Sequence, residues 1–194
     1  MKTILGDILE DFSEIGNTIC PNSFNKCNEL LRCPKHKTIE GKYLLEMPKN
    51  SSFLDIGANF GDTVLTMALH AKNNNRSDIR FFAFEPNEIK CQVIEKISER
   101  NNLKIKVYNC CVGNSEGFAI SDKLKNSFSG ACSYKYDNDS SGIKIMKIDD
   151  IENIISPVGL MHVDTEGWEI EVLKGSHNIL NNKKNSFILL CECW

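Results

Sequence analysis

From residue 51 onward, short apolar runs alternate with stretches whose apolar residues recur at helical spacing. The apolar runs predict buried strands, and the helical stretches predict amphipathic helices. The predicted strands cover 52–56, 79–84, 104–112, 143–148, 160–163 and 186–193, and the predicted helices cover 62–72, 88–101, 149–155 and 168–180. In the last helix we expect Ile170, Leu173 and Leu180 to face inward. This order predicts an α/β fold with a doubly wound, mainly parallel sheet and helices on both faces.

Two segments depart from this rhythm. Residues 1–16 have helical apolar spacing, whereas 17–50 show no period and predict an irregular segment with a short helix near 29–31. We therefore divide the chain into residues 1–50, packed on the core, and a globular domain over 51–194.

Residues 113–142 are rich in Ser, Gly, Asn and Asp. They are either a long insertion with a hairpin or a loop that contacts the substrate.

Composition excludes several classes of protein. The 194 residues are 41% hydrophobic and 25% charged, which is typical of a soluble globular protein. The net charge of −3 and the lack of a basic stripe argue against a nucleic-acid partner. No apolar run approaches the ~20 residues that cross a membrane. Acidic residues interrupt the apolar start of the chain, so we expect no export signal and a cytoplasmic location.

The nine cysteines are an odd number in a chain without an export signal. This favours free thiols over a disulfide framework. One cluster allows a second interpretation, a zinc site formed by Cys20, Cys27, Cys33 and His36. Structural zinc sites usually begin with two closely spaced ligands, and here only Cys33 and His36 are close in sequence. Buried thiols are therefore the favoured interpretation.

The chemistry-bearing motif is DIGANFG over residues 55–61, where a predicted strand turns into a helix. Glycine permits a tight turn there and lets a ligand approach the backbone. The free N–H groups of the following helix can face a carboxylate or phosphate. The glycine spacing differs from the dinucleotide fingerprint, which disfavours a nicotinamide-dependent oxidoreductase.

Acidic residues follow two further strands. Glu85 can accept hydrogen bonds from both ribose hydroxyls of an adenosine-containing cofactor, or it can be an acid at a helix start. Together with the glycine turn, it favours the cofactor interpretation. Asp164 ends an inner strand, and Glu166 follows it closely. Ionised carboxylates beside a buried strand need a partner. For His162 we favour a satisfied core histidine over a catalytic one.

Taken in order, these motifs resemble the FkbM family of S-adenosylmethionine-dependent methyltransferases. The matching segments are DIGANFG (55–61), FEP (84–86), KIDDI (147–151), VDTEGWEIEVLKGS (163–176) and ILLCE (188–192). The resemblance covers about 51–194. It implies a Rossmann-like class I methyltransferase fold without a metal. It also implies S-adenosylmethionine as cofactor and O-methylation of a hydroxyl on a sugar, glycan or small natural product.

The resemblance also assigns roles to individual residues. It implies that the cofactor is held by Asp55, Gly57, Asn59, Gly61, Glu85, Asn109, Cys111 and Val112. Within that set, Glu85 binds the ribose and residues 109–112 border the adenine. Near the transferred methyl group it implies Asp164 and Glu166, and we add His162 as a third candidate base. Glu192 matches the acid at the end of the fifth strand.

The chain ends directly after its last predicted strand, where the family continues into a closing hairpin. We therefore expect a sheet without that hairpin, in either a short form or a fragment. This keeps a second function open, a methyltransferase-like binding module without turnover. The expected partner is a small-molecule or glycan acceptor, with no nucleic acid and no membrane. The acceptor, the general base and the oligomeric state stay open.

Overall fold

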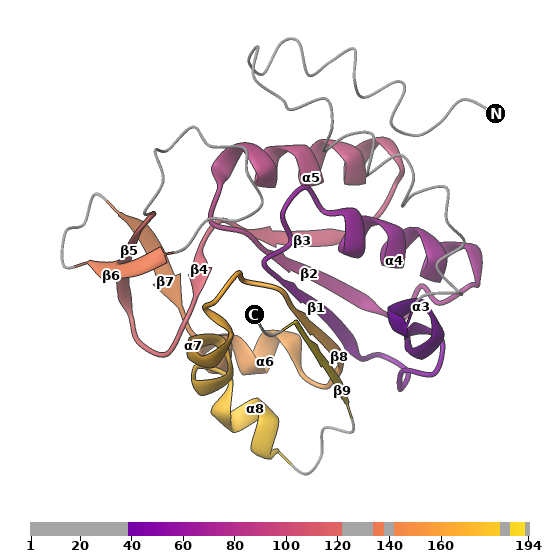
Figure 1. Ribbon diagram of the computed structural model, residues 1–194. Coiled ribbons are helices and arrows are strands. Elements are labelled where there is room, and N and C mark those ends of the chain that lie inside the picture. Colours follow the sequence, from indigo (N-terminus) through magenta and orange to yellow (C-terminus); the bar gives the residue numbers. More distant parts are fainter. Residues whose placement is uncertain (1–38, 122–133, 138–141, 183–186, 193–194) are drawn as a thin grey trace.

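The computed structural model describes residues 39–121, 134–137, 142–182 and 187–192. Its centre is a five-stranded sheet in the order β3-β2-β1-β8-β9, in which every neighbouring pair is parallel. The strands are β1 (Ser52–Ile56), β2 (Arg80–Phe84), β3 (Ile105–Tyr108), β8 (Val158–Val163) and β9 (Ile188–Cys191). The predicted α/β fold with a mainly parallel sheet is confirmed (Figure 1).

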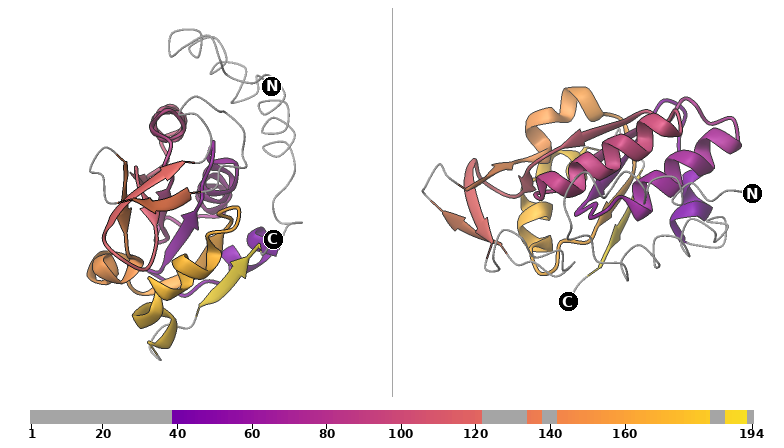
Figure 2. Two further views of the ribbon diagram at one scale, coloured as in Figure 1. Left: turned by 60° about the vertical axis from the view of Figure 1, so that its left-hand side comes forward. Right: turned by 90° about the horizontal axis from the view of Figure 1, so that it is seen from above.

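Helices cover both faces of this sheet (Figures 1 and 2). One face carries α3 (Ile39–Leu44), α4 (Asp62–Asn73) and α5 (Glu88–Arg100), and the other carries η2 (Ile148–Ile151), α6 (Glu152–Ile155), α7 (Glu169–Lys174) and α8 (His177–Asn181). Strand side chains alternate between the two cores: Phe53 of β1 packs with the first set, and Leu54 and Ile56 pack with the second. Burial on both faces explains why these strands read as continuous apolar runs. No helix in the described ranges is long and apolar enough to cross a membrane.

A second, smaller sheet lies beyond one end of the main sheet (Figure 1). It pairs β4 (Cys111–Val112), β7 (Ile143–Met146), β5 (Gly117–Ser121) and β6 (Tyr134–Asp137) in the order β4-β7-β5-β6. The antiparallel pairing of β5 with β6 agrees with one of our two interpretations of residues 113–142, an insertion with a hairpin. The single strand predicted over 104–112 is wrong. The chain turns at Asn109, whose side-chain amide donates to the carbonyls of Glu85 and Pro86, so that β3 pairs with β2 and β4 pairs with β7.

The single helix predicted over 168–180 is also wrong, because it divides into α7 and α8 at Gly175. A Cβ at Gly175 would overlap the backbone carbonyl of Gly113, so the small sheet approaches the chain closely there. The break changes which residues face inward. Val172 and Ile179 are fully buried, whereas Ile170, which we expected inside, is 67% exposed.

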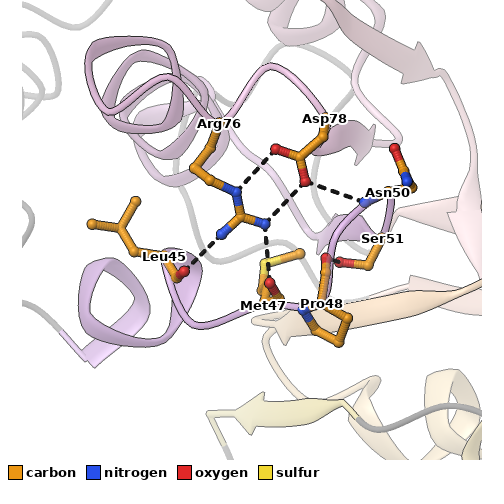
Figure 3. A network of polar contacts seen from close by, with 7 residues as sticks. All are labelled: Leu45, Met47, Pro48, Asn50, Ser51, Arg76 and Asp78. Carbon is orange, nitrogen blue, oxygen red and sulfur yellow. Dashed lines mark hydrogen bonds and ion pairs between the residues drawn. The ribbon is translucent and has the colours of Figure 1, made fainter.

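The segment before β1 is joined to the core at the opposite edge of the sheet from the glycine turn. Arg76 donates to the carbonyls of Leu45 and Met47 at 2.6 and 3.0 Å and bonds Asp78 through two nitrogens (Figure 3). Asp78 in turn accepts from the Asn50 N–H. The helix α3 is a correction, because we expected irregular chain over 17–50 apart from 29–31. The helices predicted over 1–16 and near 29–31, and the cluster Cys20, Cys27, Cys33 and His36, lie outside the described residues.

Candidate active site

Two adjoining cavities open at the carboxyl ends of strands of the main sheet. The first, here called the main cleft, is lined from the ends of β1, β2 and β8 and by the chain after β3. The second, here called the acidic cavity, encloses about 320 Å³. Its ionisable lining residues are Glu40, Asp55, Asp62, His162, Asp164 and Glu192. Gly57, Asn59 and Asp164 line both cavities and therefore form the border between them.

Three residues of the glycine turn have a left-handed backbone conformation, which residues other than glycine rarely adopt. Gly57 and Gly61 both have φ of +84°, and Asn59 has φ of +50°. A Cβ on Gly57 would overlap the backbone carbonyl of Asp164, so this glycine lets the turn pack against the chain after β8. The N–H groups of Gly57 and Ala58 donate to the Phe84 carbonyl at 3.0 and 3.1 Å. The turn is thus attached to both neighbouring strands. Gly61 does not line either cavity and packs against α5.

Asp55 is fully buried beneath the acidic cavity. One carboxylate oxygen pairs with His162 Nδ1 at 2.8 Å, and the other accepts from the Val64 N–H at the start of α4 at 3.0 Å. Burial by itself would lower the pKa of His162, but the hydrogen bond and charge of Asp55, with Glu40 and Asp164, raise it to about 9. His162 is therefore an imidazolium at neutral pH. His162 is a buried histidine whose Nδ1 pairs with Asp55, and its place among the candidate catalytic residues stays a prediction.

Glu85 lies at the carboxyl end of β2 and faces the main cleft with only 5% of its surface exposed. Its two oxygens accept from the N–H groups of Asn59 and Asn87, each at 2.9 Å. Burial raises the pKa of Glu85, while the nearby Lys90 charge and these two hydrogen bonds oppose the rise. Glu85 therefore joins the glycine turn to the start of α5. Asn109 bonds the backbone that carries Glu85 and does not line the cleft.

Asp164 and Glu166 lie in the turn after β8. Asp164 faces both cavities, and Glu166, with φ of +54°, faces the main cleft only. This turn is held by Glu169, whose Oε1 accepts from the Thr165 N–H, the Thr165 hydroxyl and the Gly167 N–H at 2.9–3.1 Å. Although burial alone would raise the pKa of Glu169, these hydrogen bonds outweigh it and hold the pKa below its ordinary value. Our sequence interpretation quoted Glu169 within the 163–176 motif but gave it no role; its place two residues after Gly167 was the available signal.

The remaining wall of the main cleft comes from the chain after β3. Cys110, Cys111 and Val112 line it, and burial raises the pKa of Cys110 to about 12, so this thiol stays protonated. Trp168 also lines the cleft and packs on Tyr136 of β6, with ring centroids 5.0 Å apart. The small sheet therefore contributes to the cleft wall directly through β4 and supports it through this aromatic pair.

The structure thus brings seven of the predicted site residues to the main cleft: Gly57, Asn59, Glu85, Cys111, Val112, Asp164 and Glu166. Asp55 and His162 lie together on the acidic cavity instead. Within the part of the chain that the structure describes, no three His, Cys, Asp or Glu side chains are arranged to hold a metal ion.

The family model of the methyltransferase FkbM domain matches residues 55–192. The chain belongs to this family. The match begins and ends at residues of the acidic cavity, Asp55 and Glu192, and it includes every lining residue of both cavities except Glu40. The resemblance inferred from the sequence is confirmed, and the protein is a methyltransferase, which requires a methyl donor. No curated protein matches the chain with significant similarity.

Proposed function

We propose that this FkbM-domain protein is an S-adenosylmethionine-dependent O-methyltransferase acting on a hydroxyl of a sugar, glycan or small natural product. The observation that carries the proposal is that Asp164 lines two adjoining cavities at the carboxyl ends of the strands. In open α/β sheets this edge is where ligands bind. The main cleft would take the methyl donor and the acidic cavity the acceptor, so transfer would occur at their border.

The residues of the main cleft fit the donor. Asn59 Oδ1 is buried without a hydrogen-bond partner among the described residues, and it would accept from the ammonium of the donor's amino-acid end. Each Glu85 oxygen holds one backbone N–H and keeps a lone pair for a ribose hydroxyl. Cys111 and Val112 would border the adenine. When bound, S-adenosylmethionine supplies an electrophilic methyl group on a sulfonium.

The protein's own contribution is to hold the acceptor oxygen about 3 Å from the methyl group that it will receive, in the direction required for an in-line displacement. A hydroxyl is a weak nucleophile, so a carboxylate that takes its proton assists the reaction. Asp164 is the first candidate for this base, because it is the one titratable candidate on the border. Glu166 is the second. His162 holds its proton at neutral pH and would serve to position Asp55 and the wall of the acidic cavity.

Two measurements test the proposal. Calorimetric titration with S-adenosylmethionine, S-adenosylhomocysteine and NAD should show binding of the first two only. Transfer of a labelled methyl group to a panel of sugars, glycans and small hydroxylated metabolites should then show label on an oxygen. Binding of NAD alone would refute the donor assignment. Donor binding with label on nitrogen would refute O-methylation, and donor binding without transfer would favour the binding-module alternative.

A further inference from the structure

Lys90 is a buried cation in the wall of the main cleft that the proposed mechanism does not use. It lies in the first turn of α5, and only 4% of its surface is exposed. Its Nζ lies 5.3 Å from the centroid of the Phe60 ring. Among the residues that the structure describes, none accepts a hydrogen bond from Nζ or forms an ion pair with it within 4 Å. The side chain lines the cleft beside Glu85 and Pro86.

A lysine whose side chain is almost entirely buried and whose three donors have no acceptor among the described residues is costly. Its Nζ is not among the fully buried atoms that lack a partner, so this atom opens on the main cleft. The face of Phe60 compensates for part of this cost. The charge of Glu85 compensates for another part, and the same attraction opposes the burial-induced rise in the pKa of Glu85. The described residues supply no hydrogen-bond acceptor for Lys90. Because Lys90 lines the main cleft, a molecule bound in the cleft can supply one.

Glu85 restricts what this acceptor can be. A phosphate or carboxylate would satisfy Lys90 but would be repelled by the neighbouring Glu85 carboxylate. An apolar group would leave the Lys90 donors without an acceptor and would leave the remaining lone pairs of Glu85 unused. A hydroxyl satisfies both, because it donates to the carboxylate and accepts from the ammonium. Two adjacent hydroxyls would supply more than one such bond, and the ribose of an adenosine-containing donor has this arrangement.

We propose that Lys90 is a specificity-determining residue that, together with Glu85, binds the ribose diol of the methyl donor. Glu85 accepts from the diol and Lys90 donates to it, so each residue uses a different half of the hydroxyl's hydrogen-bonding capacity. This inference rests on the proposed donor. It adds a second residue to a contact that the sequence assigned to Glu85 alone.

The test is a set of calorimetric titrations with S-adenosylhomocysteine and its 2′-deoxy and 3′-deoxy analogues. Lys90→Met keeps the apolar stem over Phe60 and removes the donors. We expect it to weaken binding of the hydroxylated ligand by about 10- to 100-fold, the range for a charge-assisted hydrogen bond. At least one deoxy analogue should bind Lys90→Met and wild type within a few-fold of each other. Lys96→Met, exposed on the same helix, is the matched control and should bind like wild type.

The outcomes separate this inference from the proposed function. If wild type binds no S-adenosylhomocysteine, the donor assignment fails. If wild type binds it and Lys90→Met binds equally well, the role of Lys90 is refuted. An equal loss for hydroxylated and both deoxy ligands also refutes it, because that pattern indicates a structural effect. If Lys90→Met does not fold, Lys90→Gln, with a neutral donor, should show a smaller loss confined to ligands that keep the recognised hydroxyl.

Discussion

His162 of β8 and Asp55 of β1 form a buried ion pair, with Nδ1 and Oδ1 2.8 Å apart. The two residues are direct partners in the register of the two central strands. The second oxygen of Asp55 accepts from the Val64 N–H, so the same carboxylate also holds the start of α4. Because the glycine turn lies between β1 and α4, this pair fixes both ends of the turn that borders the two cavities.

The ion pair predicts a loss of stability at alkaline pH. The pKa of His162 is about 9 in the folded protein, against an ordinary value of 6.5. Its contribution is therefore fully present below pH 6.5 and is lost as the pH rises through about 9. The shift corresponds to a contribution of about 3 kcal/mol at most. Urea unfolding between pH 6 and pH 10 measures it.

Matched variants isolate this contribution from other groups that titrate at alkaline pH. His162→Gln should be less stable than wild type at pH 6 and should approach it at pH 10. His177→Gln, at an exposed position on α8, should follow the wild-type curve throughout. If wild type and His162→Gln lose stability in parallel, the ion pair does not control this pH dependence.

Asp164→Asn should lower turnover while the affinity for the methyl donor changes little. A positioned base typically contributes about 10²–10⁴-fold to the rate, and asparagine keeps the shape but not the proton affinity. Glu166→Gln should have a smaller effect on turnover, because Glu166 faces the main cleft only. Single-turnover methyl transfer and donor titration on both variants measure this. A large affinity loss in Asp164→Asn would make Asp164 a donor-binding residue instead.

Donor affinity should fall when Glu85 loses its charge. Glu85→Ala should weaken S-adenosylmethionine and S-adenosylhomocysteine equally, by about 10- to 100-fold, because the ribose is common to both. Burial raises the pKa of Glu85, so wild-type affinity should also decline as the pH is lowered, whereas Glu85→Gln should lack this decline. Titrations from pH 8 to pH 5 test both statements. The control is Glu88→Ala, at an exposed position nearby, which should bind both ligands like wild type. If Glu85→Ala also keeps its affinity, Glu85 serves only as an acid at the start of α5.

Gly57→Ala should destabilise the fold as well as reduce donor binding. Its Cβ would meet the carbonyl of Asp164, in addition to the cost of about 1–2 kcal/mol for a left-handed backbone. Gly167→Ala is the matched comparison, because Gly167 has φ of +99° but nothing within 4 Å of the added Cβ. We expect Gly57→Ala to lower the free energy of unfolding by more than Gly167→Ala does. Equal losses would show that backbone strain alone accounts for Gly57.

Much of the fold was predictable from the sequence because its signals are local. Apolar runs over 52–56 and 79–84 became β1 and β2 with almost the same limits, since strands buried on both faces require continuous apolar residues. Residues that directly follow parallel strands come together at one edge of the sheet, so the glycine turn, Glu85 and Asp164 were predictable as neighbours. Where local signals changed within a run, at Asn109 and Gly175, the predicted element was too long.

Tertiary contacts decided what each side chain does. Asp55 and His162 are 107 residues apart in sequence, and only the register of β1 with β8 shows that they form a pair. The sequence interpretation explained Gly57 by the approach of a ligand, whereas the structure fills that space with the Asp164 backbone. Lys90 reads as an ordinary helix lysine, and its burial depends on Phe60 and Glu85 from other elements. Apolar periodicity therefore determined the elements and their layers, while burial and pairing between distant residues determined charge, proton occupancy and available hydrogen bonds.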